Sequence, residues 1–274
     1  MKNTNELIEY LTYFGFKEKE IIQIINNYAN KSMKLETLLL SIIRINVFLI
    51  SKGYTKEDII KIIKEYPTIY SYGKNNLEEK YNNLIDLDYK PKEIIKMTKI
   101  FPKIYSYSKE NIKNKINYLK QIGYTTQDIL KITKELPQIF GYAIANIDKR
   151  IKDLIEIGYE DIEEVLKITK FHVKIYSYSI ENIKQRINDL IALGYTKEQV
   201  LKITKAFPNL FGLSLENIKE KIEYLRKIEL EDIVLIDTKQ LIQSISLTHA
   251  RYEFYKNQNK DITITNYRLL FPNY

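Results

Sequence analysis

The chain repeats itself about every 35 residues, and a period of this length is typical of helical repeat proteins. The most regular marker is a Gly-Tyr dipeptide. It stands at Gly53-Tyr54, Gly123-Tyr124, Gly158-Tyr159 and Gly194-Tyr195, with Asp88-Tyr89 in the second copy. A proline follows in step at Pro67, Pro102, Pro137 and Pro208, with Val173 in the fourth copy. Each position of the unit can therefore be compared across five copies.

Two further signatures follow the proline in every copy. The first is a block of an aliphatic, an aromatic, a small and a further residue, at 69–72, 104–107, 139–142, 175–178 and 210–213. The second is an asparagine, then an aliphatic residue, then a basic residue three positions further on. The asparagines are Asn76, Asn111, Asn146, Asn182 and Asn217. Agreement at so many spaced positions indicates a structural unit.

The repeat also decides the domain organisation. A chain of 274 residues could form one domain or two, but units that contact only their neighbours build one continuous solenoid. With 45% hydrophobic and 28% charged residues, the chain has the composition of a folded protein. We predict a single solenoid domain. Its parts are an N-terminal degenerate repeat or cap at 1–52, five repeats at 53–87, 88–122, 123–157, 158–193 and 194–228, and a degenerate C-terminal repeat with a tail at 229–274.

The first part of each unit reads as a long helix followed by a short one. Thr125 precedes Asp128 with the spacing of a capping box, as Thr55 precedes Asp58, so a helix is predicted to start there. It should end before Pro137, because the residue before a proline avoids the α region. The few residues after the proline suffice only for a short 3₁₀ or single-turn helix.

The rest of the unit reads as a second long helix. Ser108, Ser179 and Ser214 have the position of N-caps, and apolar residues then follow at helical spacing. The glycine of the Gly-Tyr dipeptide is expected to close this helix with a positive φ. No strand pattern occurs within the unit. We therefore predict an all-α fold, a right-handed α-solenoid of three-helix repeats (long, short 3₁₀, long).

The pattern resembles the repeat of the mTERF (mitochondrial transcription termination factor) family. The resemblance rests on the proline with its short aromatic helix, on the Gly-Tyr-Thr sequence, and on Ser179-Ile180-Glu181-x-Ile183-x-x-Arg186-Ile187-x-x-Leu190 in the fourth repeat. It extends from about Gly53 to Phe254. It implies a superhelix of triangular units whose basic concave surface binds double-stranded DNA or, in some members, RNA, with roles in transcription.

The resemblance also points to one row of basic residues. The family's arginine falls on Arg150, Arg186 and Arg251, and lysine stands there at Lys80, Lys115 and Lys221; we call these six residues the Lys80 row. Lys115 lies beside the apolar stripe of its helix, an expensive place for a charge. Such a charge needs either a phosphate or an internal partner, for which Asp86 and Glu156 are candidates. Six phosphate contacts would give a log–log salt slope near −5, at about 0.9 per phosphate.

The first long helix carries two more rows of lysines. The Lys61 row is Lys61, Lys96, Lys131, Lys167 and Lys202, and the Lys64 row is Lys64, Lys99, Lys134, Lys170 and Lys205. Lysines opposite an apolar face are usually solvated, so either row is a weaker candidate for phosphate contact than the Lys80 row. We include the Lys64 row as secondary candidates for nucleic-acid binding.

Aromatic and polar residues of the block offer two further candidate roles. Tyr70, Tyr105 and Tyr176 could stack on bases, but aromatic residues next to a repeat junction more often fill the core. The position after each proline varies among polar residues, at Thr68, Lys103, Gln138, Lys174 and Asn209. In a modular reader such positions could address bases, and drift of surface residues explains the variation equally well.

The sequence argues against catalysis. It contains no cysteine, its two histidines, His172 and His249, lack metal-ligand spacing, and it has no P-loop, GxGxxG or GxSxG motif. We therefore expect no enzyme activity, no cofactor and no metal site.

The charge favours a polyanionic partner. The net charge is +8, and no apolar run of about 18 residues predicts a membrane span. We predict a monomeric protein that binds double-stranded DNA and regulates transcription, with RNA as the alternative target and a protein-interaction scaffold as the rival function. Because residues 1–9 contain no arginine and no apolar signal region, a cytoplasmic location is expected, or an organellar one if a leader was removed.

Overall fold

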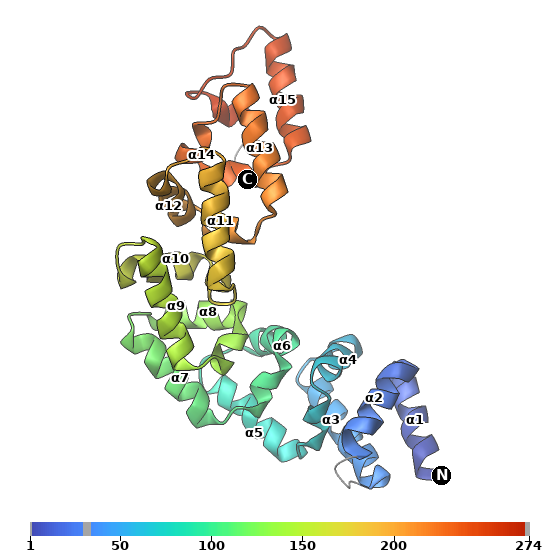
Figure 1. Ribbon diagram of the computed structural model, residues 1–274. Helices are drawn as coiled ribbons and strands as arrows, with labels where there is room; N and C mark the ends of the chain where they lie inside the picture. Colours follow the sequence, from blue (N-terminus) through green and yellow to red (C-terminus); the bar gives the residue numbers. More distant parts are fainter. Residues whose placement is uncertain (1, 30–33, 272–274) are drawn as a thin grey trace. The chain divides into compact units, whose positions relative to one another are not determined.

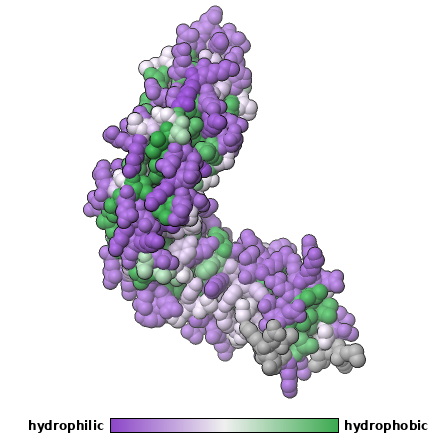
Figure 2. All heavy atoms as spheres, viewed as in Figure 1, coloured by the Kyte–Doolittle hydropathy of each residue, from purple (hydrophilic) through white to green (hydrophobic). Residues whose placement is uncertain are grey.

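The computed structural model describes residues 2–29 and 34–271, and residues 1, 30–33 and 272–274, which the predicted cap and tail include, lie outside the described residues. Every regular element in these described ranges is an α-helix or a 3₁₀ helix (Figure 1). The fold is an all-α helical repeat, as the sequence predicts. The face drawn in Figure 2 is mostly hydrophilic, because the repeats bury most of their apolar side chains between helices.

The five central repeats share one order of elements. The first long helices are α4 (Lys56–Glu65), α6 (Pro91–Ile100), α8 (Thr126–Glu135), α10 (Ile162–Phe171) and α12 (Lys197–Ala206). The 3₁₀ helices are η1 (Pro67–Ser71), η2 (Pro102–Ser106), η3 (Pro137–Gly141), η4 (Val173–Tyr176) and η5 (Pro208–Gly212). The second long helices are α5 (Lys74–Ile85), α7 (Lys109–Gln121), α9 (Ile144–Ile157), α11 (Ile180–Ala192) and α13 (Leu215–Lys227).

Local capping chemistry sets these boundaries. Thr55 accepts from the Asp58 amide at 3.1 Å while the Thr55 amide donates to the Asp58 carboxylate at 3.3 Å, which completes the predicted capping box. Ser108 caps α7 in the predicted way, by accepting from the Asn111 amide at 3.1 Å. The second helix closes on a left-handed residue, with Gly53 at φ +94°. These helix starts and ends are confirmed.

The N-terminal helices follow the order of elements of the repeat. Helix α1 (Lys2–Phe14) closes on Gly15 at φ +114°, as the second long helices of the repeats do. Helices α2 (Glu18–Ala29) and α3 (Leu35–Ser51) then occupy the places of a first and a second long helix. Helices α2 and α3 therefore correspond to the two long helices of the unit, although the sequence here lacks most of the repeat's signature.

The C-terminal repeat is shortened. Its first helix, α14 (Ile233–Ile236), has only four residues, and it precedes η6 (Thr238–Ile242) and α15 (Ile245–Asn257). A last 3₁₀ helix, η7 (Tyr267–Leu269), follows in the tail. Leu270 and Phe271, directly after η7, are almost fully buried, so the tail packs against the preceding repeat.

The chain divides into two compact units, Met1–Ile144 and Ala145–Tyr274, which we call unit 1 and unit 2. The division falls at the start of α9, inside the third repeat. Each unit contains whole junctions between consecutive repeats. The single solenoid domain stays a prediction.

The tyrosine of the Gly-Tyr dipeptide joins one repeat to the next. The Tyr54 hydroxyl lies 2.8 Å from both the Thr98 hydroxyl and the Tyr105 hydroxyl of the following repeat. Further along the chain, Tyr89 contacts Thr133 at 2.5 Å and Tyr159 contacts Thr204 at 2.8 Å. These hydroxyls are buried, so each one needs such a partner. The dipeptide therefore ends a helix and locks a junction.

Candidate nucleic-acid interface

The Lys80 row reaches across the junctions and ends on backbone carbonyls. Lys80 Nζ donates to the Tyr107 carbonyl at 3.0 Å, and Arg186 Nη2 donates to the Leu213 carbonyl at 2.7 Å. Lys115 donates to the Tyr142 carbonyl and Arg150 to the Tyr178 carbonyl in the same way. Each acceptor lies 27 or 28 residues after its donor, so the contact recurs once per repeat.

The position of the acceptor explains why a cation recurs. Tyr107, Tyr142 and Leu213 are the residues that end the 3₁₀ helices of the next repeat. Carbonyl groups at the end of a helix lack an intrahelical partner and carry partial negative charge. A lysine or arginine from the preceding repeat supplies both the donor and the opposite charge. The sequence could not reveal this partner, because every residue has a backbone carbonyl and its residue type does not mark it as an acceptor.

Lys221 and Arg251, the last two members of the row, have partners that differ from those of the first four. Arg251 Nη1 donates at 3.0 Å to the carbonyl of Leu270, which ends η7, so the tail takes the place of a further repeat. Lys221 Nζ instead donates at 2.6 Å to the Thr248 hydroxyl and lies 5.4 Å from the centre of the Phe271 ring. The tail therefore covers this junction.

Burial separates members of this row from solvent. Lys115 is 6% exposed and Lys221 is 1% exposed. Burial lowers the pKa of Lys115 and lowers that of Lys221 to about 8, because a desolvated amine resists protonation. The positions of Lys115 and Lys221 favour the structural alternative over phosphate contact. Lys80, Arg150, Arg186 and Arg251 are half-buried.

The expected carboxylate partners are replaced by these carbonyls. Asp86 accepts from Lys109 at 2.6 Å and not from the Lys80 row. Burial lowers the pKa of the Arg186 guanidinium, with Asp189 acting in the opposite direction. The row is thus embedded in the repeat junctions.

The Lys64 row forms ion pairs between consecutive repeats. Lys64 lies 2.7 Å from Glu20, Lys134 lies 2.8 Å from Glu93, Lys99 pairs with Asp58, and Lys205 pairs with Glu164 and with Glu160. Lys170 occupies the same place in its repeat. The acid lies in the first turn of the first long helix of the preceding repeat, where its negative charge interacts favourably with the helix dipole.

One junction shows what happens when the acid is missing. Gln199 takes the acid's place in α12, and Leu235 takes the lysine's place in the next repeat. The loss of the acid and the loss of the lysine occur together, because a lysine at position 235 would have no carboxylate at position 199 to pair with. This pairing indicates that the acid and the lysine act as one unit.

These ion pairs are expected to contribute little to stability. Lys134 and Glu93 are 33% and 27% exposed, and partly exposed pairs contribute about 0.2–1 kcal/mol. Lys134→Met should therefore lower the free energy of unfolding by less than about 1 kcal/mol at pH 7. The hydrogen bond from Lys134 lowers the pKa of Glu93, so this contribution is present above the ordinary glutamate pKa and is lost as the pH falls through the folded value.

Urea unfolding of wild-type protein and of the Lys134→Met variant at pH 7 and pH 4 measures this contribution. A variant that loses several kcal/mol at pH 7 would contradict it, and so would a difference that grows on acidification.

The Lys61 row is the most solvated of the three rows. All five of its lysines are exposed. Within residues 2–29 and 34–271, Lys61, Lys96, Lys167 and Lys202 have neither a side-chain hydrogen bond nor an ion pair. Their charges therefore face water without a protein partner.

The tyrosines of the aromatic block belong to the core. Tyr70 and Tyr105 are fully buried and Tyr176 is 6% exposed. Tyr70 donates to the Asn46 side chain at 2.9 Å. Burial raises the pKa of Tyr105 well above its usual value. These rings favour core packing over base stacking, and sequence reasoning missed Asn46 as a partner.

The variable positions after the prolines differ in exposure. Lys103, Lys174 and Asn209 are exposed, whereas Thr68 and Gln138 are half-buried. The exposed members could reach a ligand. A role in reading bases stays a prediction.

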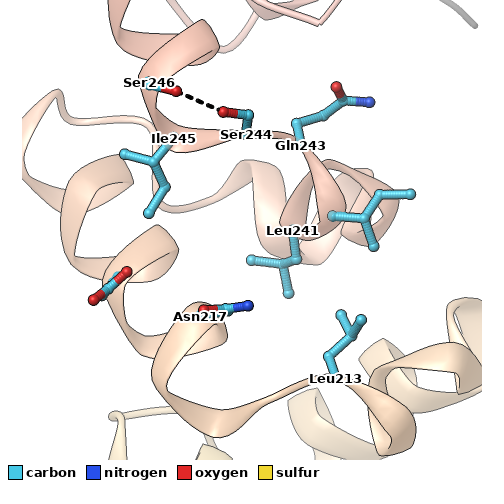
Figure 3. Close-up of a pocket in the computed structure, with 9 residues that line it drawn as sticks. Leu213, Asn217, Leu241, Gln243, Ser244, Ile245 and Ser246 are labelled. Atoms are coloured by element: carbon cyan, nitrogen blue, oxygen red, sulfur yellow. Dashed lines mark hydrogen bonds between the residues drawn. The ribbon is translucent and has the colours of Figure 1, made fainter.

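An open pocket of about 400 Å³ lies where the last junction departs from the others. In earlier junctions a tyrosine from one repeat lies against a small residue of the next, and a Cβ on Gly212 would come within 2.6 Å of the Tyr178 hydroxyl. In the last junction Leu213 replaces the tyrosine and Ile242 replaces the small residue. Figure 3 shows Leu213, Leu241 and Asn217 around the resulting hollow.

Each histidine lies within hydrogen-bond distance of a tyrosine hydroxyl. His172 Nε2 lies 3.2 Å from the Tyr178 hydroxyl and His249 Nδ1 lies 3.3 Å from the Tyr224 hydroxyl. Among the residues described, no group of three His, Asp or Glu side chains is arranged to hold a metal ion. No helix in the same part of the chain is both long and apolar enough to span a membrane.

A comparison with protein families identifies the repeat. A model of the mTERF family matches residues 1–157 and 131–237, which together cover most of the chain. The chain belongs to the mTERF family. Members of the mTERF family generally bind nucleic acids and are linked to transcription, and the match indicates no catalytic family. A comparison with the curated proteins found no match.

Proposed function

We propose that this mTERF protein binds double-stranded DNA through phosphate contacts and acts in the regulation of transcription. The observation that carries the proposal is the family match over residues 1–237. The net charge of +8 supports it, because phosphate contacts supply most of the affinity of non-specific binding.

The rival functions predict different ligands. An RNA-binding member of the family would use the same exposed cations, because RNA also presents phosphates. A protein-interaction scaffold would bind neither nucleic acid tightly. The sequence and the fold favour a polyanion over a peptide because one exposed lysine of the Lys61 row recurs in each of the five central repeats.

Fluorescence anisotropy of labelled duplex DNA, single-stranded DNA and RNA of the same sequence tests the proposal. Each ligand is titrated with the full chain between 50 and 200 mM salt. We expect the duplex to bind most tightly, with a log–log salt slope of about −4 to −5. Tighter binding of RNA would overturn the choice of DNA, and failure to bind any of the three at 50 mM salt would overturn nucleic-acid binding itself.

A further inference from the structure

We propose that the Lys61 row contacts the phosphates, while the Lys80 row and the Lys64 row meet internal partners at the repeat junctions. This inference rests on the proposed function and names the side chains that carry it. The three rows are equally regular in the sequence. They differ in what each side chain meets.

Internal partners account for the regularity of two rows. Five of the six cations of the Lys80 row donate to a backbone carbonyl of the following repeat or of the tail, and Lys221 donates to the Thr248 hydroxyl instead. A lysine of the Lys64 row pairs with an acid of the preceding repeat. Where Gln199 replaces that acid, the next repeat has Leu235 in place of the lysine. Neither explanation extends to the Lys61 row, because Lys61, Lys96, Lys167 and Lys202 have no such partner in the described ranges.

The neighbours of the Lys61 row change while the lysine does not. Four residues before it the chain has Glu57, Lys92, Gln127, Glu163 and Glu198. Four residues after it the chain has Glu65, Ile100, Glu135, Phe171 and Ala206. All ten positions are exposed. A local pair with the preceding residue cannot explain the lysine, because that residue is acidic, neutral or basic in different copies.

The spacing of the row suits a nucleic-acid backbone. In unit 1, α4 packs against α6 and α6 packs against α8, so Lys61, Lys96 and Lys131 lie on consecutive helices. Packed helices lie about 8–10 Å apart. One strand of a duplex presents a phosphate for every 3.4 Å or so of its axis. A flexible lysine on each helix can therefore meet every second or third phosphate.

The Lys64 row forms ion pairs with acids of the preceding repeats, whereas Lys61, Lys96, Lys167 and Lys202 form none in the described ranges. The Lys64 row lies three residues further along the same helices, but its ion-pair partners Glu20, Asp58, Glu93 and Glu164 offset its charge. An unpaired exposed lysine releases a counterion from the nucleic acid when it binds, whereas a lysine that must first leave a carboxylate gains less.

The test compares two variants that each lose four exposed lysines. The first replaces Lys61, Lys96, Lys167 and Lys202 with glutamine, which preserves helix propensity. The matched control replaces Lys113, Lys120, Lys152 and Lys184, exposed lysines of the second long helices, in the same way. Both sets divide evenly between unit 1 and unit 2. Circular dichroism and thermal unfolding establish that both variants remain folded.

The readout is the salt slope of duplex binding by wild-type protein and both variants. We expect the Lys61-row variant to lose about three to four units of slope and the control to lose less than about one. Equal losses in the two variants would overturn the inference and leave nucleic-acid binding in place. A wild-type protein that binds no nucleic acid would overturn the proposed function, which the titration shows before any variant is compared.

Discussion

Lys221→Met is expected to stabilise unit 2 by about 1–3 kcal/mol at pH 7. Lys221 is 1% exposed, and burial lowers its pKa to about 8, whereas an unfolded lysine has a pKa near 10.4. Keeping the amine protonated in the folded state therefore costs about 3 kcal/mol at pH 7, at about 1.4 kcal/mol per pKa unit. Methionine keeps most of the stem and removes the charge. Thr248 remains satisfied because its hydroxyl donates to the Ser244 carbonyl.

The pH dependence of this effect has a definite sign. Below pH 8 both states are protonated and the penalty is complete. Between pH 8 and about 10.4 the unfolded state holds more protons, so wild-type stability rises with pH relative to the variant. The advantage of Lys221→Met should shrink by about 2 kcal/mol between pH 7 and 9.5. Ionisation of tyrosines in the unfolded chain affects wild type and variant alike, because both contain the same tyrosines, so it cancels in this comparison.

Urea unfolding of wild-type and Lys221→Met protein at pH 7 and 9.5 measures both quantities. The conservative variant Lys221→Arg serves as the control, because it keeps a charge that does not titrate in this range. A Lys221→Met variant that is less stable than wild type at pH 7, or an advantage that grows with pH, would contradict the account.

Tyr105→Ala is expected to destabilise unit 1 by about 3–5 kcal/mol. Tyr105 is fully buried, and its hydroxyl lies 2.8 Å from that of Tyr54 in the preceding repeat. Removing the ring leaves a cavity at the junction. Tyr105→Phe should cost only about 1 kcal/mol, because Tyr54 keeps its contact with Thr98 at 2.8 Å.

Thermal and urea unfolding of the two variants distinguish the stability lost through the cavity from the stability lost through the hydrogen bond. Duplex binding by Tyr105→Phe should match that of wild type, because the ring lies in the core. A large loss of binding in this folded variant would contradict the assignment of Tyr105 to the core, and so would an alanine variant as stable as wild type.

The fold was predictable because its signals are local. Thr55 and Asp58 lie three residues apart and form their capping box within one turn, and Gly53 meets its requirement for a positive φ in its own backbone. Such patterns are visible in a single stretch of sequence. Because the unit repeats, a helix boundary inferred in one copy could be assigned at the same position in the others.

The roles of the basic rows were not predictable in the same way. Lys115 and Lys134 both belong to rows that recur once per repeat, and their roles depend on the partner that each side chain meets. The partner of Lys115 is a carbonyl 27 residues away, and the partner of Lys134 is Glu93, 41 residues away. These contacts cross repeat junctions, so they depend on how neighbouring units pack and not on the helix that carries the lysine.

Lysine labelling with an acetylating reagent, read by mass spectrometry with and without duplex DNA, tests the central claim most directly. We expect fast labelling of Lys61, Lys96, Lys167 and Lys202 that the duplex suppresses, and slow labelling of Lys115 and Lys221 in both conditions, because these two amines are buried. Fast labelling of Lys115 and Lys221 that DNA suppresses, with the Lys61 row unprotected, would contradict it.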